Sequence, residues 1–340
     1  MRPVIAITMG DPAGIGPEIA VKALSDNAVY EYCKPVVIGD AVVIEFISKL
    51  LRSDLKINII SNVKDALFEY GAIDVLDLHF YRDEPVYGKV SAEAGHAAFE
   101  SVIRAIDLAL QKKVDATVTA PINKESIHLA GINFAGHTEI YAHYTKTGRY
   151  AMLLVHDNLR VIHVSTHVSL RQACDLVKQE RILEVIKLLY DACLRFGIGN
   201  PRIAVAGLNP HSSDNGLFGW EEEREIIPAI NKARQSGYNI DGPVPADTMF
   251  SKALGGMYDG CVAMYHDQGH IPFKVVGFRW DEEKAKMDVK GVNITLGLPI
   301  IRVSVDHGTA FEIAGRGIAS EEAMLRSIEY AAKMSKTSEQ

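Results

Sequence analysis

Three apolar, strand-like runs of this chain each end on a histidine: Val161–His167, Ile203–His211 and Cys261–His266. Parallel strands buried on both faces are near-continuous apolar runs. In open α/β sheets, ligands bind just beyond the carboxyl ends of such strands. Three imidazoles at one edge could hold a divalent cation with an open coordination position. A lone histidine is more often a surface or core group, but core packing gives no reason to repeat this placement after three strands.

Strand-like runs alternate with helical patterns along the chain. In Glu180–Phe196 apolar residues recur every three or four positions, and Ala92–Lys112 is a second helical pattern. This alternation predicts an α/β fold, a largely parallel sheet with helices on both faces. Because no linker is visible, we expect two interwoven lobes, 1–125 with 300–340 and 126–299, and a site in the cleft between them. The expected strands are Val4–Thr8, Pro35–Ile38, Ile57–Ile60, Val114–Thr119, Ala151–Val155, Val161–Ser165, Ile203–Ala206, Val262–Tyr265 and Val292–Leu296.

The composition, 48% hydrophobic and 23% charged residues in a chain of 340, is that of an ordinary globular protein. The net charge of −7 argues against nonspecific nucleic-acid binding. No apolar run approaches the roughly 18 residues of a membrane span, and a strand begins at Val4 without a signal segment. Four scattered cysteines without CxxC spacing are typical of reduced thiols. We therefore expect a cytoplasmic protein without nucleic-acid or membrane partners.

The segment Thr8–Glu18 follows the first strand and opens a helix. Gly14 and Gly16 resemble the start of a dinucleotide-binding fingerprint, but the third glycine is missing, so the evidence is weak. Pro17 suits the first turn of a helix, where its absent N–H is not needed. We interpret this segment as a tight turn near the site and not as a P-loop or Rossmann loop.

A second group of polar residues could bind an anion. His137 and Thr138 precede the helical run Glu139–Lys146, and the free amides of a helix N-terminus attract anions; Thr138 could equally serve only as a helix cap. Cations and an amide occur near further strand ends, where a phosphate or carboxylate would need them, although Lys and Arg are more often solvated surface groups. These residues are Arg171, Lys274, Asn293 and Arg302.

The segment Asp306–Gly317 combines glycines with a polar Asp-His-Gly-Thr cluster. A glycine-rich loop that turns backbone amides toward a ligand suits a nucleotide. A purely structural turn before the last helix would explain the glycines but not the polar cluster.

Five strings are specific enough to suggest a family: Gly207-Leu208-Asn209-Pro210-His211, Pro245-Ala246-Asp247-Thr248, Met264-Tyr265-His266-Asp267-Gln268-Gly269, Gly291-Val292-Asn293-Ile294-Thr295-Leu296-Gly297-Leu298-Pro299 and Ser304-Val305-Asp306-His307-Gly308-Thr309-Ala310. With them, essentially the whole chain resembles the 4-hydroxythreonine-4-phosphate dehydrogenase family of the vitamin B6 pathway. The last string is also similar to the cofactor loop of isocitrate and isopropylmalate dehydrogenases. The resemblance implies that fold, with NAD and a divalent cation as cofactors.

The resemblance also assigns roles, which we carry over residue by residue. The family is a homodimer in which the third metal histidine reaches into the partner's site, so His266 would act across the interface and the second lobe would carry the metal and dimer contacts. The implied metal ligands are His167, His211 and His266. The implied substrate contacts are His137, Thr138, Arg171, Lys274, Asn293 and Arg302. The implied cofactor loop is Asp306, His307, Gly308, Thr309 and Ala310. The candidates for proton transfer, or for orienting a metal ligand, are Lys274, Asp247 and Asp267.

Two departures distinguish this chain from the vitamin B6 enzyme. That enzyme continues almost directly from Gly277-Phe278 to the Gly-Val-Asn string, whereas Arg279–Lys290 intervenes here as a charged, exposed excursion. The run His270–Lys274 is more similar to the branch of 4-phospho-D-threonate and 4-phospho-D-erythronate 3-dehydrogenases. A terephthalate dihydrodiol dehydrogenase is similar in the same places.

We therefore expect metal-dependent, NAD-linked oxidation of the C3 hydroxyl of a 4-phosphorylated four-carbon acid. Loss of CO2 from the resulting β-keto acid would give dihydroxyacetone phosphate. Three imidazoles suit zinc, cobalt, manganese or magnesium. The alternatives are the vitamin B6 reaction, a dihydrodiol dehydrogenase, a hydrolase or lyase that uses the metal without a nucleotide, and a non-enzymatic binding protein.

Overall fold

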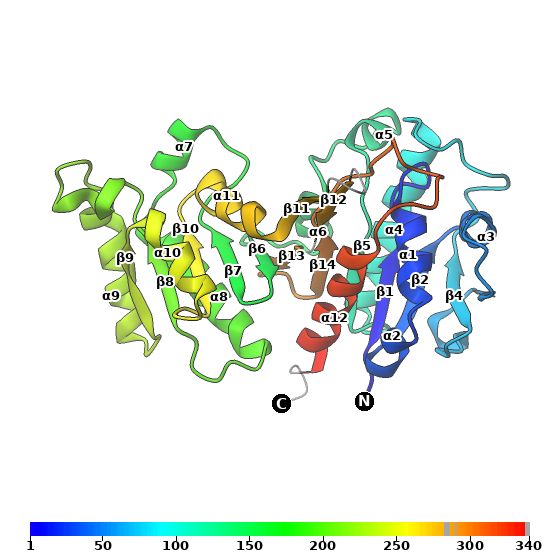
Figure 1. Ribbon diagram of the computed structural model, residues 1–340, viewed down its shortest axis with the longest axis horizontal. Coiled ribbons are helices and arrows are strands. Elements are labelled where there is room, and N and C mark those ends of the chain that lie inside the picture. The colour runs from blue at the N-terminus through cyan, green and yellow to red at the C-terminus, as the bar shows by residue number, and fades with distance from the viewer. Residues whose placement is uncertain (282–285, 290, 337–340) are drawn as a thin grey trace. The chain divides into compact units, whose positions relative to one another are not determined.

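The computed structural model describes residues 1–281, 286–289 and 291–336. The chain divides into two compact units, of which unit 1 is Met1–Arg149 with Leu298–Gln340 and unit 2 is Tyr150–Gly297 (Figure 1). The chain thus leaves unit 1 once and returns to it, as interwoven lobes require.

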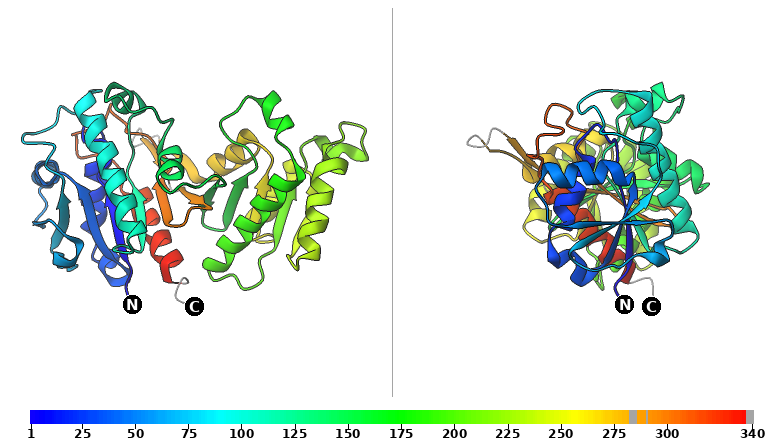
Figure 2. Two further views of the ribbon diagram at one scale, coloured as in Figure 1. Left: turned by 180° about the vertical axis from the view of Figure 1, so that it is seen from behind. Right: turned by 90° about the vertical axis from the view of Figure 1, so that its right-hand side faces the viewer.

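Unit 1 is a parallel sheet with helices on both faces. Its strands lie in the order β3-β4-β2-β1-β5-β14, and the pairings of β1, β2, β4 and β5 are all parallel. Helices α1 and α12 lie in front of this sheet in Figure 1, whereas α4 covers the opposite face in the rear view of Figure 2. The strands are β1 (Val4–Thr8), β2 (Lys34–Gly39), β3 (Lys56–Ile60), β4 (Ala72–Asp77), β5 (Ala116–Thr119) and β14 (Ile301–Val305). The helices are α1 (Gly16–Leu24), α2 (Asn27–Tyr32), α3 (Ala41–Leu50), η1 (Val63–Asp65), α4 (Ala92–Leu110), α5 (Lys124–Leu129), α6 (His137–Tyr144) and α12 (Glu322–Lys336).

Unit 2 has a mixed sheet in the order β13-β6-β7-β10-β8-β9. Strand β6 is antiparallel to both of its neighbours, and β7, β10, β8 and β9 are parallel to one another. The strands are β6 (Ala151–His156), β7 (Leu159–His163), β8 (Ile203–Ala206), β9 (Ile240–Val244), β10 (Gly260–Ala263) and β13 (Val292–Leu296). The helices are α7 (Leu170–Asp175), α8 (Gln179–Arg195), η2 (Pro210–Asp214), η3 (Glu222–Ile226), α9 (Ile227–Gln235), α10 (Ala246–Leu254) and α11 (His266–Gly277).

The charged excursion begins as one arm of an antiparallel pair. Strands β11 (Phe278–Asp281) and β12 (Lys286–Val289) pair with each other. The remainder of the predicted excursion, residues 282–285 and 290, lies outside the described residues.

The predicted α/β class with a largely parallel sheet is confirmed. Each expected run overlaps a strand of the structure, and β1, β8 and β13 match their expected bounds. Strands β4, β9 and β14 and the β11–β12 pair are absent from the prediction. In β4, β9 and β14 the apolar run is interrupted: by Asp74 in β4, by Asp241-Gly242-Pro243 in β9 and by Arg302 in β14. Within the described part of the chain, every helix is too short or too polar to cross a lipid bilayer.

The boundary between the units differs from the expected one. Residues 126–149, which the sequence pattern places in the second lobe, belong to unit 1. The reason is packing: Ile140 and Tyr141 of α6 are fully buried in a cluster with Phe99, Val102 and Ile106 of α4. At Gly95 a side chain would lie 2.0 Å from the carbonyl oxygen of Ser126, so α4 and α5 are also in direct backbone contact. These contacts anchor the segment on α4.

Candidate functional site

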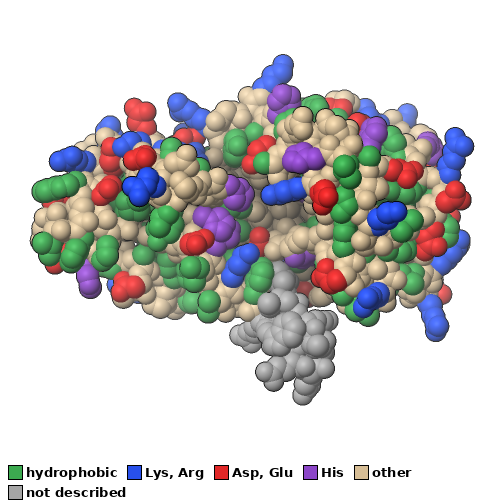
Figure 3. Space-filling view, turned by 90° about the horizontal axis from the view of Figure 1, so that it is seen from above, with side chains coloured by type: hydrophobic (Ala, Val, Ile, Leu, Met, Phe, Trp, Pro, Cys, Tyr) green, Lys and Arg blue, Asp and Glu red, His purple; other side chains and the backbone are tan. Residues whose placement is uncertain are grey.

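The three predicted metal-ligand histidines follow three adjacent parallel strands of unit 2. His167 comes four residues after β7, His266 three residues after β10 and His211 five residues after β8. Because β10 pairs with both β7 and β8 in parallel, these strands end at the same edge of the sheet. Histidine side chains gather on the face seen in Figure 3.

Within one chain the structure brings two of the three histidines together. The rings of His167 and His266 have centroids 5.9 Å apart. The His211 ring lies instead near Phe218, at 6.4 Å, in a run of residues with positive φ that begins at φ +53° for His211 itself. Among the described residues, no three His, Cys, Asp or Glu side chains of this chain form a group that could hold a metal ion.

Asp267 fixes the tautomer of His266. Its carboxylate oxygen Oδ1 lies 2.6 Å from Nδ1 of the His266 ring. A carboxylate only accepts hydrogen bonds, so Nδ1 carries the proton and Nε2 is left as the ligand atom. This contact supports an orienting role for Asp267. Asp247 lies exposed in the first turn of α10.

Two further histidines adjoin this pair, and sequence reasoning did not find them. His270 stacks on His266 with centroids 3.7 Å apart and planes 11° apart, and its Nδ1 lies 3.1 Å from the His266 carbonyl oxygen. The ring of His163, at the end of β7, is 4.6 Å from that of His270. Burial lowers the pKa of His163 to about 3 and that of His270 to about 4. Both rings are therefore neutral at pH 7. The available signal was the spacing of four residues between His266 and His270, which places both on one face of a helix.

The donor set fits a divalent cation. Neutral imidazole nitrogens are ligands for zinc, cobalt and manganese. The side chain of His266 is 37% exposed. His266 also has the carboxylate partner that metal-binding histidines commonly use. Among the described residues of one chain, His211, the third predicted ligand, forms no three-residue metal group with the other two.

A separate polar cluster in unit 1 suits an anion. Arg302 of β14 is only 3% exposed and donates from Nη2 to the Thr119 hydroxyl at 2.9 Å. Burial of His137 lowers its pKa, and the nearby charge of Arg302 lowers it further. His137 is therefore neutral, and its ring can accept one hydrogen bond and donate one. His137 and Thr138 are the first residues of α6, where the helix dipole also favours negative charge. The buried Nε2 of His137 has no protein partner among the described residues.

The aromatic ring of Tyr141 contacts the guanidinium group of Arg302. The ring centroid lies 5.5 Å from the guanidinium carbon, a cation–π distance. Its hydroxyl donates to Thr117 at 2.9 Å. Burial lowers the pKa of Arg302 to about 10, which still leaves the side chain cationic at pH 7. A phosphate or carboxylate beside this guanidinium would form charge-assisted hydrogen bonds, which are strong.

The remaining predicted substrate residues lie in unit 2. Lys274 is exposed on α11 with its ammonium 5.1 Å from the Phe278 ring centroid. The amide nitrogen of Asn293 donates to the sulfur of Met152 at 2.7 Å. Arg171 is exposed on α7. The two units therefore position three predicted substrate residues each.

The N-terminal turn holds the predicted cofactor loop. Glu18, with no solvent exposure, accepts hydrogen bonds from the amides of Gly317 at 3.2 Å and Ala319 at 2.7 Å. Lys22 donates to the carbonyl oxygens of the same two residues at 3.0 and 2.6 Å and to Glu18 at 2.9 Å. Sequence reasoning identified the turn but not this ion pair, which links helix α1 to the far end of the loop.

The same loop is also held at its start. The amide of Ile15 donates to the carbonyl oxygen of Thr309 at 3.0 Å, and a side chain at Gly14 would lie 3.0 Å from Thr309. Gly14 is therefore needed for close backbone approach, as a glycine in a nucleotide-binding turn often is. The Nδ1 of His307 lies 3.0 Å from the Gly308 carbonyl oxygen, and burial lowers its pKa. Gly308 itself faces open space. A loop with this open glycine, next to a glycine turn, fits a nucleotide.

Comparison with known proteins places the chain in a family. Residues 31–331 match the family model described as pyridoxal phosphate biosynthetic protein PdxA. The chain belongs to the PdxA family. It is therefore a dehydrogenase of that family.

Three relatives are similar to this chain over nearly its full length. The D-threonate 4-phosphate dehydrogenase of Cupriavidus necator is 47% identical, over 98% of this chain and 97% of its own. A crystal structure of 4-hydroxythreonine-4-phosphate dehydrogenase from Klebsiella pneumoniae is 46% identical with a TM-score of 0.87, covering 98% of both chains. A terephthalate 1,2-cis-dihydrodiol dehydrogenase from Burkholderia xenovorans is 30% identical with a TM-score of 0.68, over 97% of this chain and 98% of its own.

We expect Glu18→Gln to loosen the cofactor loop. The substitution removes the charge from three hydrogen bonds, two from backbone amides and one from Lys22, which should lower the free energy of unfolding by about 1.5–3 kcal/mol. Hydrogen exchange at the amides of Gly317 and Ala319 should become faster. Glu329→Gln on the surface of α12 is the matched control and should change stability by less than about 0.5 kcal/mol. Unchanged exchange at both amides would contradict the role of Glu18.

Proposed function

We propose that this PdxA-family dehydrogenase oxidises the C3 hydroxyl of 4-phospho-D-threonate or 4-phospho-D-erythronate with NAD as the acceptor. Loss of CO2 from the β-keto acid product then gives dihydroxyacetone phosphate. The observation that carries the proposal is the buried guanidinium of Arg302 near His137, in a chain that is 47% identical to a D-threonate 4-phosphate dehydrogenase. Such a cluster recognises a fixed anionic group, and the proposed substrate has one at each end.

In this proposal two groups of residues bind different polar groups of the substrate. Arg302, His137 and Thr138 of unit 1 hold one anionic end, because charge-assisted hydrogen bonds to a buried guanidinium are strong. Arg171, Lys274 and Asn293 of unit 2 hold the other polar groups. Lys274, Asp247 and Asp267 are the candidates that accept the proton of the C3 hydroxyl.

His167, His211 and His266 are proposed to hold a divalent cation: zinc, cobalt, manganese or magnesium. When bound, such a cation would lower the pKa of the C3 hydroxyl as a Lewis acid. Asp267 keeps Nε2 of His266 available for it. The proposed assembly is a homodimer in which His266 completes the partner's site. The lack of a three-residue metal group within the described part of one chain supports a shared site.

A substrate panel tests the proposed function. NADH formation is followed by absorbance with phosphorylated threonate, erythronate and hydroxythreonine, and with a cyclic dihydrodiol. We expect turnover with a phosphorylated four-carbon acid and formation of dihydroxyacetone phosphate. Preference for phosphorylated hydroxythreonine would instead assign the vitamin B6 reaction, and preference for the dihydrodiol would assign the terephthalate-type reaction. Chemistry without NADH formation would indicate a hydrolase or lyase.

Arg302→Met should weaken substrate binding selectively. Methionine keeps the hydrophobic packing on Tyr141 but loses the charge and the donor groups, so KM should rise by about 2–3 kcal/mol in binding free energy, roughly 30- to 150-fold. Thermal unfolding checks that the variant is folded. Arg326→Met, on the surface of α12, is the control and should leave KM unchanged. If KM for the phosphorylated acid is unaffected in Arg302→Met, the cluster does not bind the substrate.

Subunit complementation tests the shared metal site. His211→Ala and His266→Ala proteins should each be inactive, but after subunit exchange a mixed dimer keeps one complete set of ligands. Random exchange should restore about a quarter of wild-type activity in a twofold-symmetric dimer. Exchange itself is verified by mass labelling.

A second mixture identifies which histidine crosses the interface. Recovery with His167→Ala and His266→Ala places His266 opposite the other two ligands, as proposed. Recovery with His167→Ala and His211→Ala places His167 and His266 in one chain, as their 5.9 Å separation would allow, and would overturn the proposed role of His266. Verified exchange without recovery in any mixture would overturn the shared site.

A further inference from the structure

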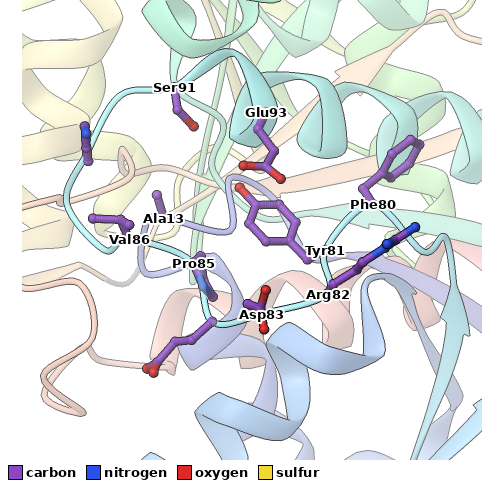
Figure 4. Close-up of a pocket in the computed structure, with 11 residues that line it drawn as sticks. Ala13, Phe80, Tyr81, Arg82, Asp83, Pro85, Val86, Ser91 and Glu93 are labelled. Carbon is purple, nitrogen blue, oxygen red and sulfur yellow. The ribbon is translucent and has the colours of Figure 1, made fainter.

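A cavity of about 520 Å³ in unit 1 lies between the turn at Ala13 and the segment 80–93 (Figure 4). The amide of Gly88 donates to the carbonyl oxygen of Ala13 at 2.8 Å, and a side chain at Gly88 would lie 2.7 Å from the carbonyl oxygen of Phe311. The cavity therefore adjoins the predicted cofactor loop and belongs with it. The buried histidines of unit 2, by contrast, have no role in the function proposed above.

These buried histidines are His163 and His270, which are 1% and 7% exposed. Their rings have centroids 4.6 Å apart, and the ring of His270 stacks on that of His266 at 3.7 Å. The three rings form a stack that runs from the end of β7 to the partly exposed side chain of His266. Polar side chains in a core are the informative exceptions to burial by hydrophobicity. Here they place two buried rings behind a predicted metal ligand.

Gln268 fixes the start of α11 relative to two neighbouring strands. Its Oε1 accepts a hydrogen bond from the amide of Met264, just after β10, at 2.7 Å. Its Nε2 donates to the carbonyl oxygen of Gly207, just after β8, at 2.8 Å. The side chain thus bridges two strand ends whose following loops carry His266 and His211. The first turn of α11 therefore has a fixed position on the sheet.

The next residue, Gly269, brings the backbone of α11 onto the ring of His163. A side chain at Gly269 would lie 2.3 Å from Nε2 of His163. One turn further along the helix, Phe273 is fully buried in the core of unit 2. Because the backbone is held at these points, the side chain of His270 starts from a fixed position. Its ring lies between those of His163 and His266.

The ring of His270 also has a defined orientation. Its Nδ1 lies 3.1 Å from the carbonyl oxygen of His266. A carbonyl oxygen only accepts hydrogen bonds, so Nδ1 carries the proton. This hydrogen bond sets the ring face to face with that of His266, with the two planes 11° apart.

His266 needs such a contact to keep its own ring in place. A histidine ring rotates broadly about its last side-chain bond. Asp267 holds one edge of the His266 ring, but the side chain of Asp267 is 69% exposed, so water competes for its carboxylate. The ring of His270 is buried and covers one face of the His266 ring. It is therefore the firmer of the two constraints.

We propose that His270 is a positioning residue, whose ring holds the imidazole of His266 in the orientation seen here so that Nε2 can bind the divalent cation. The inference rests on the proposed metal role of His266. A ring that is ordered before the cation arrives loses less entropy on binding. Groups that orient a metal ligand typically contribute roughly 10- to 100-fold to the affinity for the metal. Loss of the His270 ring should therefore weaken metal binding without removing a ligand atom.

Titration of metal-free protein with Co²⁺ tests the proposal without turnover, because the visible absorption of bound Co²⁺ depends on the geometry of its ligands. His270→Asn keeps a donor near the place of Nδ1 but removes the ring. It should weaken Co²⁺ binding about tenfold or more and change the spectrum of the bound ion. His270→Phe restores a ring and should bind Co²⁺ within about threefold of the wild type, with the wild-type spectrum. His128→Asn, in the exposed last turn of α5, is the matched control and should bind Co²⁺ like the wild type.

Thermal unfolding checks that each variant is folded. If His270→Asn is not, His270→Leu, which keeps apolar volume without a ring, takes its place with the same expected loss. Wild-type affinity and spectrum in a folded variant without the ring would overturn the role of His270 and leave the metal site in place. A loss in His270→Phe as large as that in His270→Asn would also overturn it. If wild-type protein binds no Co²⁺, the proposed metal role of His266 fails, and the role of His270 fails with it.

Discussion

The parallel pairing of strands is the constraint from which the candidate sites follow. In unit 1 it brings the segments after β1, β4, β5 and β14 to one edge, and in unit 2 it does the same after β7, β10 and β8. Each segment would otherwise be a short polar loop with no reason to meet the others. His266 follows β10, and β10 is hydrogen-bonded to β7, which precedes His167. A shift of β10 by one residue along β7 would therefore move His266 away from His167.

Buried charges stabilise the segments that these strands deliver. Glu18 is fully buried and accepts hydrogen bonds from the backbone amides of Gly317 and Ala319 and from Lys22. Asp40 has the same relation to the segment that begins at Phe80. A buried carboxylate without donors would be costly, so each one specifies the conformation of the loop that satisfies it. Burial raises the pKa of Asp40 because it disfavours the charged carboxylate, and the hydrogen bonds from Tyr81 and Phe80 act in the opposite direction.

Much of this arrangement could be predicted from the sequence, and the exceptions have physical causes. The α/β class and most strands follow from apolar runs, because a strand buried on both faces has to be apolar throughout. Strand β14 was missed since Arg302 interrupts its run, and a charge inside a strand argues against burial unless the tertiary partners are known. Those partners, Thr119 and Tyr141, come from β5 and α6, more than 150 residues away in the chain.

The site shows the same limit. The three histidines that follow strands could be identified because their placement repeats, and the resemblance then assigned their roles. His163 was missed because it ends β7 two residues before the expected end of that strand, so the pattern hid it within the strand. Glu18 was missed because its partners, Gly317 and Ala319, are about 300 positions distant. Sequence patterns report neighbours along a strand or helix, whereas these contacts depend on which strands are adjacent.

The two units differ in the charge of their buried polar side chains. Unit 1 keeps a buried cation, Arg302, next to a helix N-terminus, which favours an anion. In unit 2 burial lowers the pKa of His163 and His270, and like-charge repulsion from His266 acts in the same direction. Protonated imidazoles there would repel a divalent cation, whereas neutral ones can support the ligand that faces it. Burial thus keeps His163 and His270 neutral, and neutral rings are compatible with a metal ion bound to the neighbouring His266.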